Sequence, residues 1–158
     1  MMMPRVLTVA GSDSGGGAGI QADLKTITLL GGFGMSAVTA LTAQNTRGVR
    51  SIHEVPPDFV ALQMEMVISD IGVDAMKTGM LGSPATIRAV CQKIRQHRLR
   101  QVVVDPVIVA KYGAQLLSPE GKETLQRELL PLAQVVTPNL PEAEVLTGKK
   151  VELSLIHI

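Results

Sequence analysis

The sequence has little cysteine, few aromatic residues and no excess of either charge. Cys91 is the one cysteine, so no disulfide can form within the chain. Aromatic residues make up 2% of the sequence, too few for the platforms on which nucleic-acid bases stack. Fifteen basic and fourteen acidic residues give a formal net charge of +1. We therefore expect neither nucleic acid nor an acidic membrane surface as a partner.

Signals for export or membrane insertion are also lacking. Residues 1–5 contain no basic region followed by a long apolar core, which a secretory signal needs. Residues 26–46 carry no charge, and their length is compatible with a membrane span. However, Gly31, Gly32 and Gly34 interrupt this stretch, so a helix end, a turn and a buried strand fit it better. We expect a cytoplasmic protein.

Apolar runs that are typical of buried strands alternate with helical segments along the chain. Hydrophobic residues make up 46% of the 158 residues, enough for the core of one domain. The expected strands are 6–10, 35–43, 49–55, 75–78, 101–105 and 135–137, and the expected helices after the first are 57–70, 84–97 and 118–130. The alternation predicts an α/β fold in which helices cover both faces of a mostly parallel sheet.

Two expectations concern which side chains enter the core. Cys91 lies on the apolar stripe of Ile87, Val90 and Ile94, so we expect a buried thiol rather than a reactive one. In the helix predicted over residues 57–70, we expect four side chains to face inward: Phe59, Leu62, Met66 and Val67.

A glycine-rich stretch, residues 10–25, joins the first strand to the first helix. Such a loop can bring backbone N–H groups close to a ligand. It is not a Walker-type phosphate loop, because Ile20 rather than Lys follows Gly19. A dinucleotide fingerprint fits Gly17, Gly19 and Ala22 only loosely, since residues 27–53 hold no acid to bind a ribose.

Polar residues near the predicted strand ends are candidates for ligand contacts. Asp23 lies on the apolar face of the first helix, where an unpaired charge is costly, so we expect it to contact a ligand. Gln44 ends a strand at the edge where open α/β sheets bind ligands, although an ordinary polar loop explains it equally well. Met80 could pack on a flat ligand, whereas Lys77 lies inside a strand and is expected to be structural.

Two acidic residues occur later in the chain at comparable positions. Asp105 follows a buried strand, and Pro106 ends the strand pairing. Glu142 comes three residues after Asn139, which is the spacing of a helix capping box. A capping role and a metal-binding role for Glu142 are compatible with each other.

Five segments resemble the hydroxymethylpyrimidine and phosphomethylpyrimidine kinases of thiamin biosynthesis, which belong to the ribokinase-like superfamily. They are residues 10–26, 34–46, 77–81, 103–107 and 137–142, and with their spacing they span nearly all of residues 5–148. The resemblance implies a three-layer α/β/α sandwich. It also implies ATP-dependent phosphorylation of 4-amino-5-hydroxymethyl-2-methylpyrimidine and its monophosphate, and a candidate homodimer for the full-length enzyme.

The resemblance also implies roles for individual residues. Substrate contacts fall on Gly11, Asp23, Gln44, Met80 and Val107. Asp105 and Glu142 would serve ATP and hold its Mg²⁺. A pyridoxal kinase of the same superfamily is the alternative enzyme, and a ligand-binding fragment without catalysis is the alternative from another class.

The resemblance stops near Gly148, whereas the family continues for about 100 further residues. That remaining part holds the glycine-rich anion hole, the residue that activates the hydroxyl group and most of the adenine pocket. We therefore expect residues 1–148 to be the N-terminal part of one kinase domain, with no catalytic residue of its own. Residues 153–158 resemble the translation of a sequencing adaptor, so we expect residues 149–158 to be a non-native or disordered tail.

Overall fold

A six-stranded sheet forms the centre of the computed structural model, which describes residues 3–108 and 117–151. Its strand order is β3-β2-β1-β4-β5-β6. All neighbours run parallel except β2 and β3, which form an antiparallel hairpin. The strands are β1 (Arg5–Asp13), β2 (Phe33–Asn45), β3 (Gly48–Glu54), β4 (Ala75–Thr78), β5 (Val102–Val104) and β6 (Val135–Val136).

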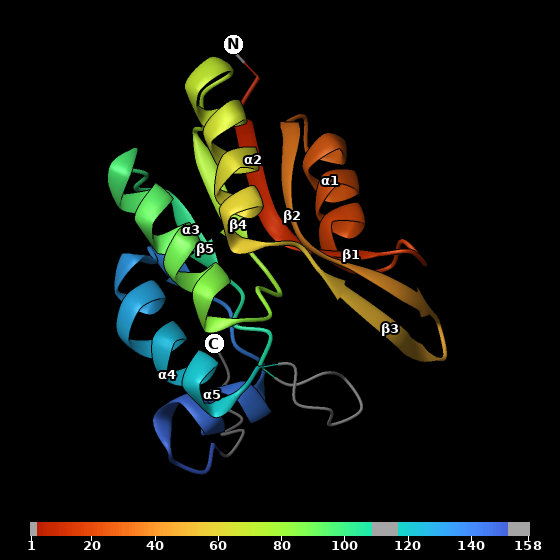
Figure 1. Cartoon of the computed structure of the whole chain (residues 1–158), viewed down its shortest axis with the longest axis vertical. Helices are drawn as coiled ribbons and strands as arrows, with labels where there is room; N and C mark the ends of the chain where they lie inside the picture. The colour runs from red at the N-terminus through yellow and green to blue at the C-terminus, as the bar shows by residue number, and fades with distance from the viewer. Residues whose placement is uncertain (1–2, 109–116, 152–158) are drawn as a thin grey trace, which may run out of the picture.

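Helices cover both faces of this sheet, so the α/β expectation is confirmed (Figure 1). One helix, α1 (Gly19–Leu29), packs on β1 and β2 from one side. The opposite face carries α2 (Pro57–Asp70), α3 (Pro84–Gln96) and α4 (Pro119–Thr124). The chain continues through a π-helical turn (Leu125–Leu129), a 3-10 turn (Leu130–Leu132) and α5 (Leu140–Thr147), which follows β6.

Local capping residues explain where most helices begin. The Ser83 side chain accepts a hydrogen bond from Thr86 N, and Pro84 occupies the first turn of α3. Ser118 caps α4 in the same way. The expected helix over 118–130 forms, but its type changes from α4 to the π-helical turn at Leu125. The proline at position 131 has no N–H to donate, so a regular α-helix cannot continue through it.

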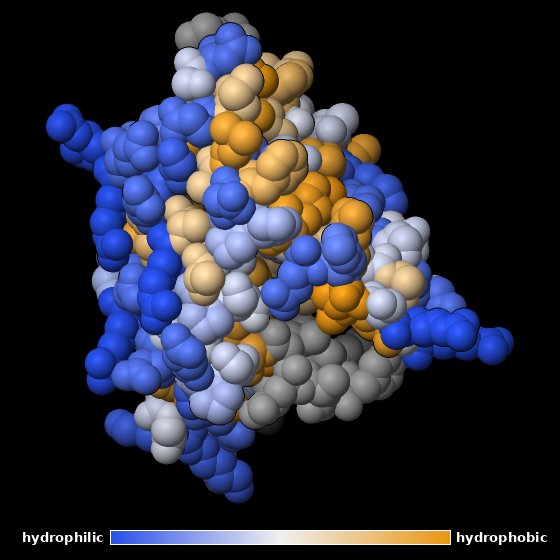
Figure 2. Space-filling model, viewed as in Figure 1, coloured by the Kyte–Doolittle hydropathy of each residue, from blue (hydrophilic) through white to orange (hydrophobic). Residues whose placement is uncertain are grey.

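The buried face of α2 differs from the expectation. Val60 and Met64 are fully buried, whereas Phe59, Leu62 and Met66 are 54%, 52% and 62% exposed. Only Val67 of the four expected residues packs against the core. The prediction was wrong because α2 is apolar around most of its circumference, so periodicity could not select one face. Figure 2 shows the resulting apolar surface over α2.

Three further expectations concern the thiol of Cys91, a membrane-spanning helix and the C-terminal residues. Cys91 is fully buried, and burial raises the pKa of its thiol to about 11. The reactive-thiol alternative is therefore excluded. Across the described ranges, no helix is both long and apolar enough to cross a bilayer. Residues 153–158, which carry the adaptor hypothesis, lie outside the described part of the chain.

Candidate functional site

The carboxyl ends of β1 and β4 meet closely at one rim of the sheet. Gly11 of β1 lies directly against Met80, which follows β4: a Cβ atom at Gly11 would be 2.6 Å from Met80 Cε. Thr39 of β2 donates a hydrogen bond of 2.6 Å from Oγ1 to the Met80 carbonyl oxygen. The Met80 side chain thus lies over a glycine that leaves room for it.

The glycine-rich loop after β1 is organised by Asp13, a residue that the sequence did not single out. The Asp13 carboxylate is 6% exposed and accepts three backbone hydrogen bonds, from Gly15 N (2.8 Å), Gly17 N (3.0 Å) and Ala18 N (2.8 Å). A fourth loop N–H, that of Gly16, donates to the Asp13 carbonyl oxygen. The loop therefore directs these N–H groups inward, and the expectation that they approach a ligand does not hold for them.

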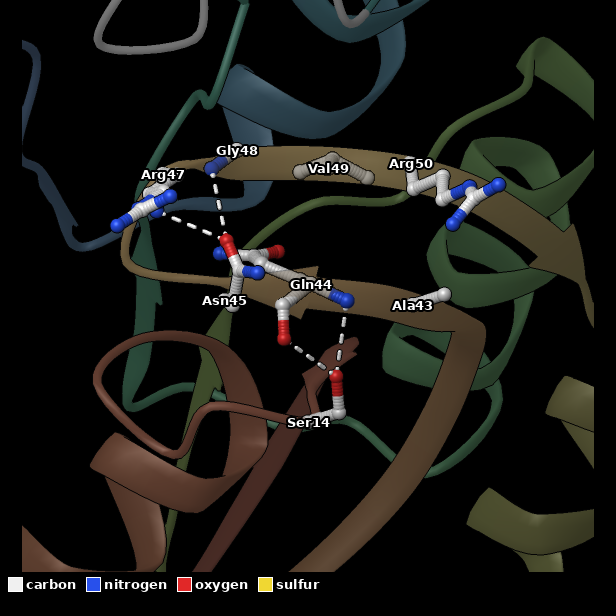
Figure 3. A pocket seen from close by; sticks show the side chains of 8 residues that line it. All are labelled: Ser14, Ala43, Gln44, Asn45, Arg47, Gly48, Val49 and Arg50. Carbon is white, nitrogen blue, oxygen red and sulfur yellow. Dashed lines mark hydrogen bonds between the residues drawn. The ribbon is translucent and has the colours of Figure 1, made fainter.

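The same loop is tied to the ends of β1 and β2. Gln21 of α1 accepts a hydrogen bond from Asp13 N and donates one to Ser12 Oγ, both at 2.8 Å. Ser14 Oγ donates to the Gln44 carbonyl oxygen (2.7 Å) and accepts from Gln44 N (2.9 Å), as Figure 3 shows. The main chain at Gln44 is thereby fixed relative to the glycine-rich loop.

A shallow pocket with a volume of about 560 Å³ lies beside the β2–β3 hairpin. Gln44 is the predicted substrate residue that lines it, and its side chain accepts a hydrogen bond of 3.3 Å from Thr42 Oγ1. Gly11, Asp23 and Met80 do not line this pocket. The full lining is Ser14, Ala43, Gln44, Asn45, Arg47, Gly48, Val49 and Arg50.

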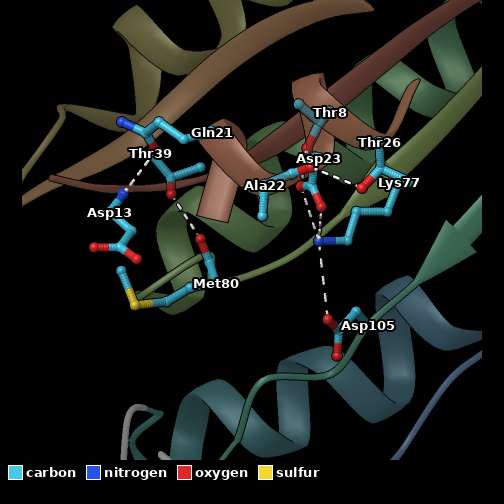
Figure 4. Close-up of polar contacts among 10 residues, drawn as sticks. All are labelled: Thr8, Asp13, Gln21, Ala22, Asp23, Thr26, Thr39, Lys77, Met80 and Asp105. Atoms are coloured by element: carbon cyan, nitrogen blue, oxygen red, sulfur yellow. Dashed lines mark hydrogen bonds and ion pairs between the residues drawn. The ribbon is translucent and has the colours of Figure 1, made fainter. Parts of the chain in front are cut away.

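Asp23 contacts a lysine from a strand far away in the sequence. Lys77 Nζ lies 3.1 Å from Asp23 Oδ1 and 3.0 Å from Oδ2, and Thr8 Oγ1 donates to Oδ2 at 2.6 Å (Figure 4). The sequence argument for a ligand at Asp23 rested on an unpaired charge, and Lys77 removes that premise. A carboxylate has about four acceptor sites, so these three hydrogen bonds leave one acceptor site on Oδ1 for a donor.

Lys77 also faces Asp105 at the end of β5. Lys77 Nζ is 3.8 Å from Asp105 Oδ2, and Asp105 N donates to the Thr78 carbonyl oxygen at 3.0 Å. Burial raises the pKa of the Asp105 carboxyl; Lys77 opposes this shift, and the negative charges of Glu142 and Asp23 reinforce it. Lys77, Glu142 and Asp23 therefore all act electrostatically on Asp105.

Glu142 forms the capping box that the sequence predicted. It is 2% exposed, its Oε2 accepts from Asn139 N (3.1 Å), and Asn139 Oδ1 accepts from Glu142 N (2.9 Å). Its Oε1 also accepts a hydrogen bond from Ile108 N (3.0 Å), which fixes the segment after β5. Just before that residue, Val107 has a φ of 44°, a strained conformation for a β-branched residue and one that often occurs at functional sites.

The donor set suits Mg²⁺ that arrives with a nucleotide. Within the described ranges, no group of three or more His, Cys, Asp or Glu side chains could hold a metal ion by itself. Mg²⁺ is commonly held by one or two carboxylates together with substrate phosphates and water. Asp105 and Glu142 are carboxylates of this kind, and each retains unused lone pairs.

The mostly parallel sheet, with polar side chains at its carboxyl rim, has the fold of the ribokinase-like class. The sequence profile of the phosphomethylpyrimidine kinase family matches residues 13–155, and the chain belongs to that family. It is 64% identical over 146 residues to the thiamine biosynthesis bifunctional protein ThiED of Geobacter sulfurreducens, covering 92% of this chain and 30% of that protein. It is 51% identical to the hydroxymethylpyrimidine/phosphomethylpyrimidine kinase of Salmonella typhimurium, covering 92% of this chain and 55% of that protein.

Solved structures agree with this family assignment. The phosphomethylpyrimidine kinase of Clostridium difficile 630 superimposes with a TM-score of 0.89 at 48% identity, covering 94% of this chain and 64% of that chain. Bacillus subtilis pyridoxal kinase, described as an ADP complex, gives a TM-score of 0.88 at 42% identity, covering 98% of this chain and 58% of that chain. The predicted family and fold are confirmed, and the chain spans about half the length of most of these relatives.

Proposed function

We propose that residues 1–148 are the N-terminal part of an ATP-dependent kinase for 4-amino-5-hydroxymethyl-2-methylpyrimidine and its monophosphate, in thiamin diphosphate biosynthesis. The observation that carries the proposal is the contact network from Asp23 through Lys77 to Asp105, which joins a candidate pyrimidine side to a candidate nucleotide side. Family membership supports the same reaction. ATP is supported as the donor by relatives whose structures contain ADP or AMP-PCP.

On the pyrimidine side, we assign a role to each of the residues that the resemblance implies. The remaining acceptor site of Asp23 would receive the exocyclic amino group. Met80, held over Gly11, would pack on the ring face. Gln44 would offer its side-chain amide from the end of β2, and the strained main chain at Val107 would contact the ring edge.

On the nucleotide side, Asp105 and Glu142 would hold the Mg²⁺ of Mg-ATP. When bound, Mg²⁺ neutralises negative charge on the phosphates during transfer. Glu142 contributes a second effect, because its hydrogen bond from Ile108 N fixes the backbone that follows Asp105. Phosphoryl transfer depends mostly on such positioning and on charge neutralisation.

The wider biology follows from the same assignment. We propose a cytoplasmic enzyme that binds neither nucleic acid nor membrane, which the balanced charge and the use of ATP support. We also propose a homodimer of the full-length enzyme, because α2 keeps Phe59, Leu62 and Met66 exposed as one apolar stripe.

Turnover assays on two proteins test the proposed function. The first is the chain as given; the second is a chimera that joins residues 1–148 to the C-terminal part of the Salmonella typhimurium relative. We expect the chimera to phosphorylate the pyrimidine and the chain alone to show no turnover. Loss of even one preorganised donor to developing charge costs about 10²–10³ in rate, and we propose that these donors lie outside residues 1–148.

Competition with pyridoxal distinguishes the alternative enzyme. In the chimera, we expect the pyrimidine to displace pyridoxal at equal concentration. A chimera that prefers pyridoxal would favour the pyridoxal kinase alternative. Turnover by the 158-residue chain alone would contradict the proposal that the catalytic donors come from outside residues 1–148.

A further inference from the structure

Lys77 occupies an unusual position for a charged residue. It lies in β4, which has a parallel strand on each side, and such strands normally carry apolar side chains on both faces. Its side chain is 26% exposed and reaches over Gly79 toward the rim: a Cβ atom at Gly79 would lie 3.0 Å from Lys77 Nζ. The glycine therefore leaves space for the ammonium group to reach both carboxylates.

The contacts of Lys77 with the two carboxylates differ in kind. With Asp23 it makes hydrogen bonds to both oxygens, at 3.1 and 3.0 Å, and so fixes the rotation of that carboxylate. With Asp105 the distance is 3.8 Å, which is too long for a good hydrogen bond but short enough for a strong charge interaction. Lys77 thus fixes the orientation of the Asp23 carboxylate and places a positive charge near Asp105.

A purely structural ion pair explains less of this arrangement. A pair that served only to attach α1 to the sheet would need Asp23 alone, and an apolar pair of similar volume could replace it. Here the ammonium lies between two carboxylates, those of Asp23 and Asp105, and Asp105 also feels the negative charge of Glu142. Its removal would leave these negative charges without the opposing charge of Lys77.

We propose that Lys77 is a positioning residue for both halves of the site: it orients Asp23 for the pyrimidine, and its charge keeps Asp105 from binding a bare divalent cation. The first half rests on the proposed function, whereas the second rests only on the charges around Asp105. Divalent metal would then enter together with the nucleotide, whose phosphates supply the missing ligands.

The two halves predict effects of opposite sign in Lys77→Met. The Asp23 carboxylate would lose two charge-assisted hydrogen bonds and its fixed orientation, so pyrimidine affinity should fall about 10- to 100-fold. Removal of a positive charge near Asp105 should strengthen the binding of Mn²⁺ alone about tenfold. A variant that merely loosened the fold would weaken both.

The test uses the 158-residue chain and two probes, 4-amino-5-hydroxymethyl-2-methylpyrimidine by calorimetry and Mn²⁺ by electron paramagnetic resonance. Lys122→Met in α4 is the control, because it makes the same charge change at a lysine that forms no ion pair with Asp23 or Asp105. Lys77→Arg keeps the charge, so it should retain the Mn²⁺ affinity of the unmodified chain and lose part of the pyrimidine affinity. Adding Asp105→Asn to Lys77→Met should abolish the gain in Mn²⁺ binding.

Each outcome decides the proposal. Opposite changes in Lys77→Met, with no change in Lys122→Met, support it; unchanged affinities, or a parallel loss of both, overturn it. If Lys77→Met does not fold, Lys77→Arg decides, and unchanged pyrimidine affinity there overturns the positioning role. If the unmodified chain does not bind the pyrimidine, the proposed function fails in this chain, and the Mn²⁺ measurements alone support or overturn the role of Lys77.

Discussion

Replacing Asp13 by alanine should open the glycine-rich loop without unfolding the sheet. The carboxylate accepts backbone hydrogen bonds from Gly15, Gly17 and Ala18, and the substitution leaves these three N–H groups without that partner. A hydrogen bond to a charged group contributes about 1.5–3 kcal/mol. The N–H groups belong to a surface loop and can bond to water instead. We therefore expect the free energy of unfolding to fall by about 2–4 kcal/mol, less than the sum of three such hydrogen bonds.

Asp13→Asn is the matched variant. Its amide oxygen can keep the two hydrogen bonds that converge on Oδ2, from Gly17 and Ala18. Its NH₂ group would then face the Gly15 N–H, donor against donor, so we expect a loss of about 1–2 kcal/mol.

Amide hydrogen exchange followed by NMR measures this prediction locally. Exchange at Gly15, Gly17 and Ala18 should accelerate strongly in Asp13→Ala and less in Asp13→Asn, while exchange in the fully buried residues Val9 and Leu7 of β1 stays slow. If the three loop amides exchange at unchanged rates in Asp13→Ala, the carboxylate does not hold the loop and the argument fails.

Three further predictions follow from individual contacts. Hydrogen bonds from Arg5 lower the pKa of Asp74 from 3.8 to about 2. This pair therefore stabilises the fold above pH 3.8, and its contribution is lost as the pH falls to about 2. In Asp74→Asn, a circular dichroism titration should show a smaller loss of stability between pH 3.8 and about 2. Met64→Ala should lower the free energy of unfolding in urea by about 2–5 kcal/mol, and Met66→Ala by less than about 0.5 kcal/mol. Equal losses would contradict the orientation of α2. In the chimera, Asp23→Asn and Gln44→Ala should each weaken pyrimidine binding by about 1–3 kcal/mol with little effect on nucleotide, and calorimetry that finds no loss would remove them from the site.

Features that depend on neighbours in sequence could be predicted from the sequence. The caps at Ser83, Ser118 and Asn139 are formed by side chains bonding three residues ahead, so spacing alone identifies them. The strands along 75–78 and 102–104 follow from short apolar runs for the same reason. The inward face of α2 depends instead on packing against α3 and β2, and the helix's own apolar pattern does not encode those partners.

In the candidate site, too, the sequence predicts what depends on near neighbours and not what depends on packing between distant segments. Asp23 was selected because an unpaired carboxylate on an apolar helix face is costly, and that physical argument remains sound. The structure satisfies it with Lys77, a residue 54 positions away that looked structural because it lies inside a strand. The sequence does not link the two residues, since a charge on a helix and a charge on a strand share no periodic pattern.

The register of β1 and β4 is what brings them together. Thr8 of β1 lies opposite Lys77 of β4, and α1 crosses β1 so that Asp23 lies within hydrogen-bonding distance of both. Asp105 joins the cluster because β5 ends one residue before it, beside Thr78. The cost of burying charge could therefore predict that Asp23 needs a partner, whereas only the strand order could show that the partner also reaches Asp105 at the end of β5.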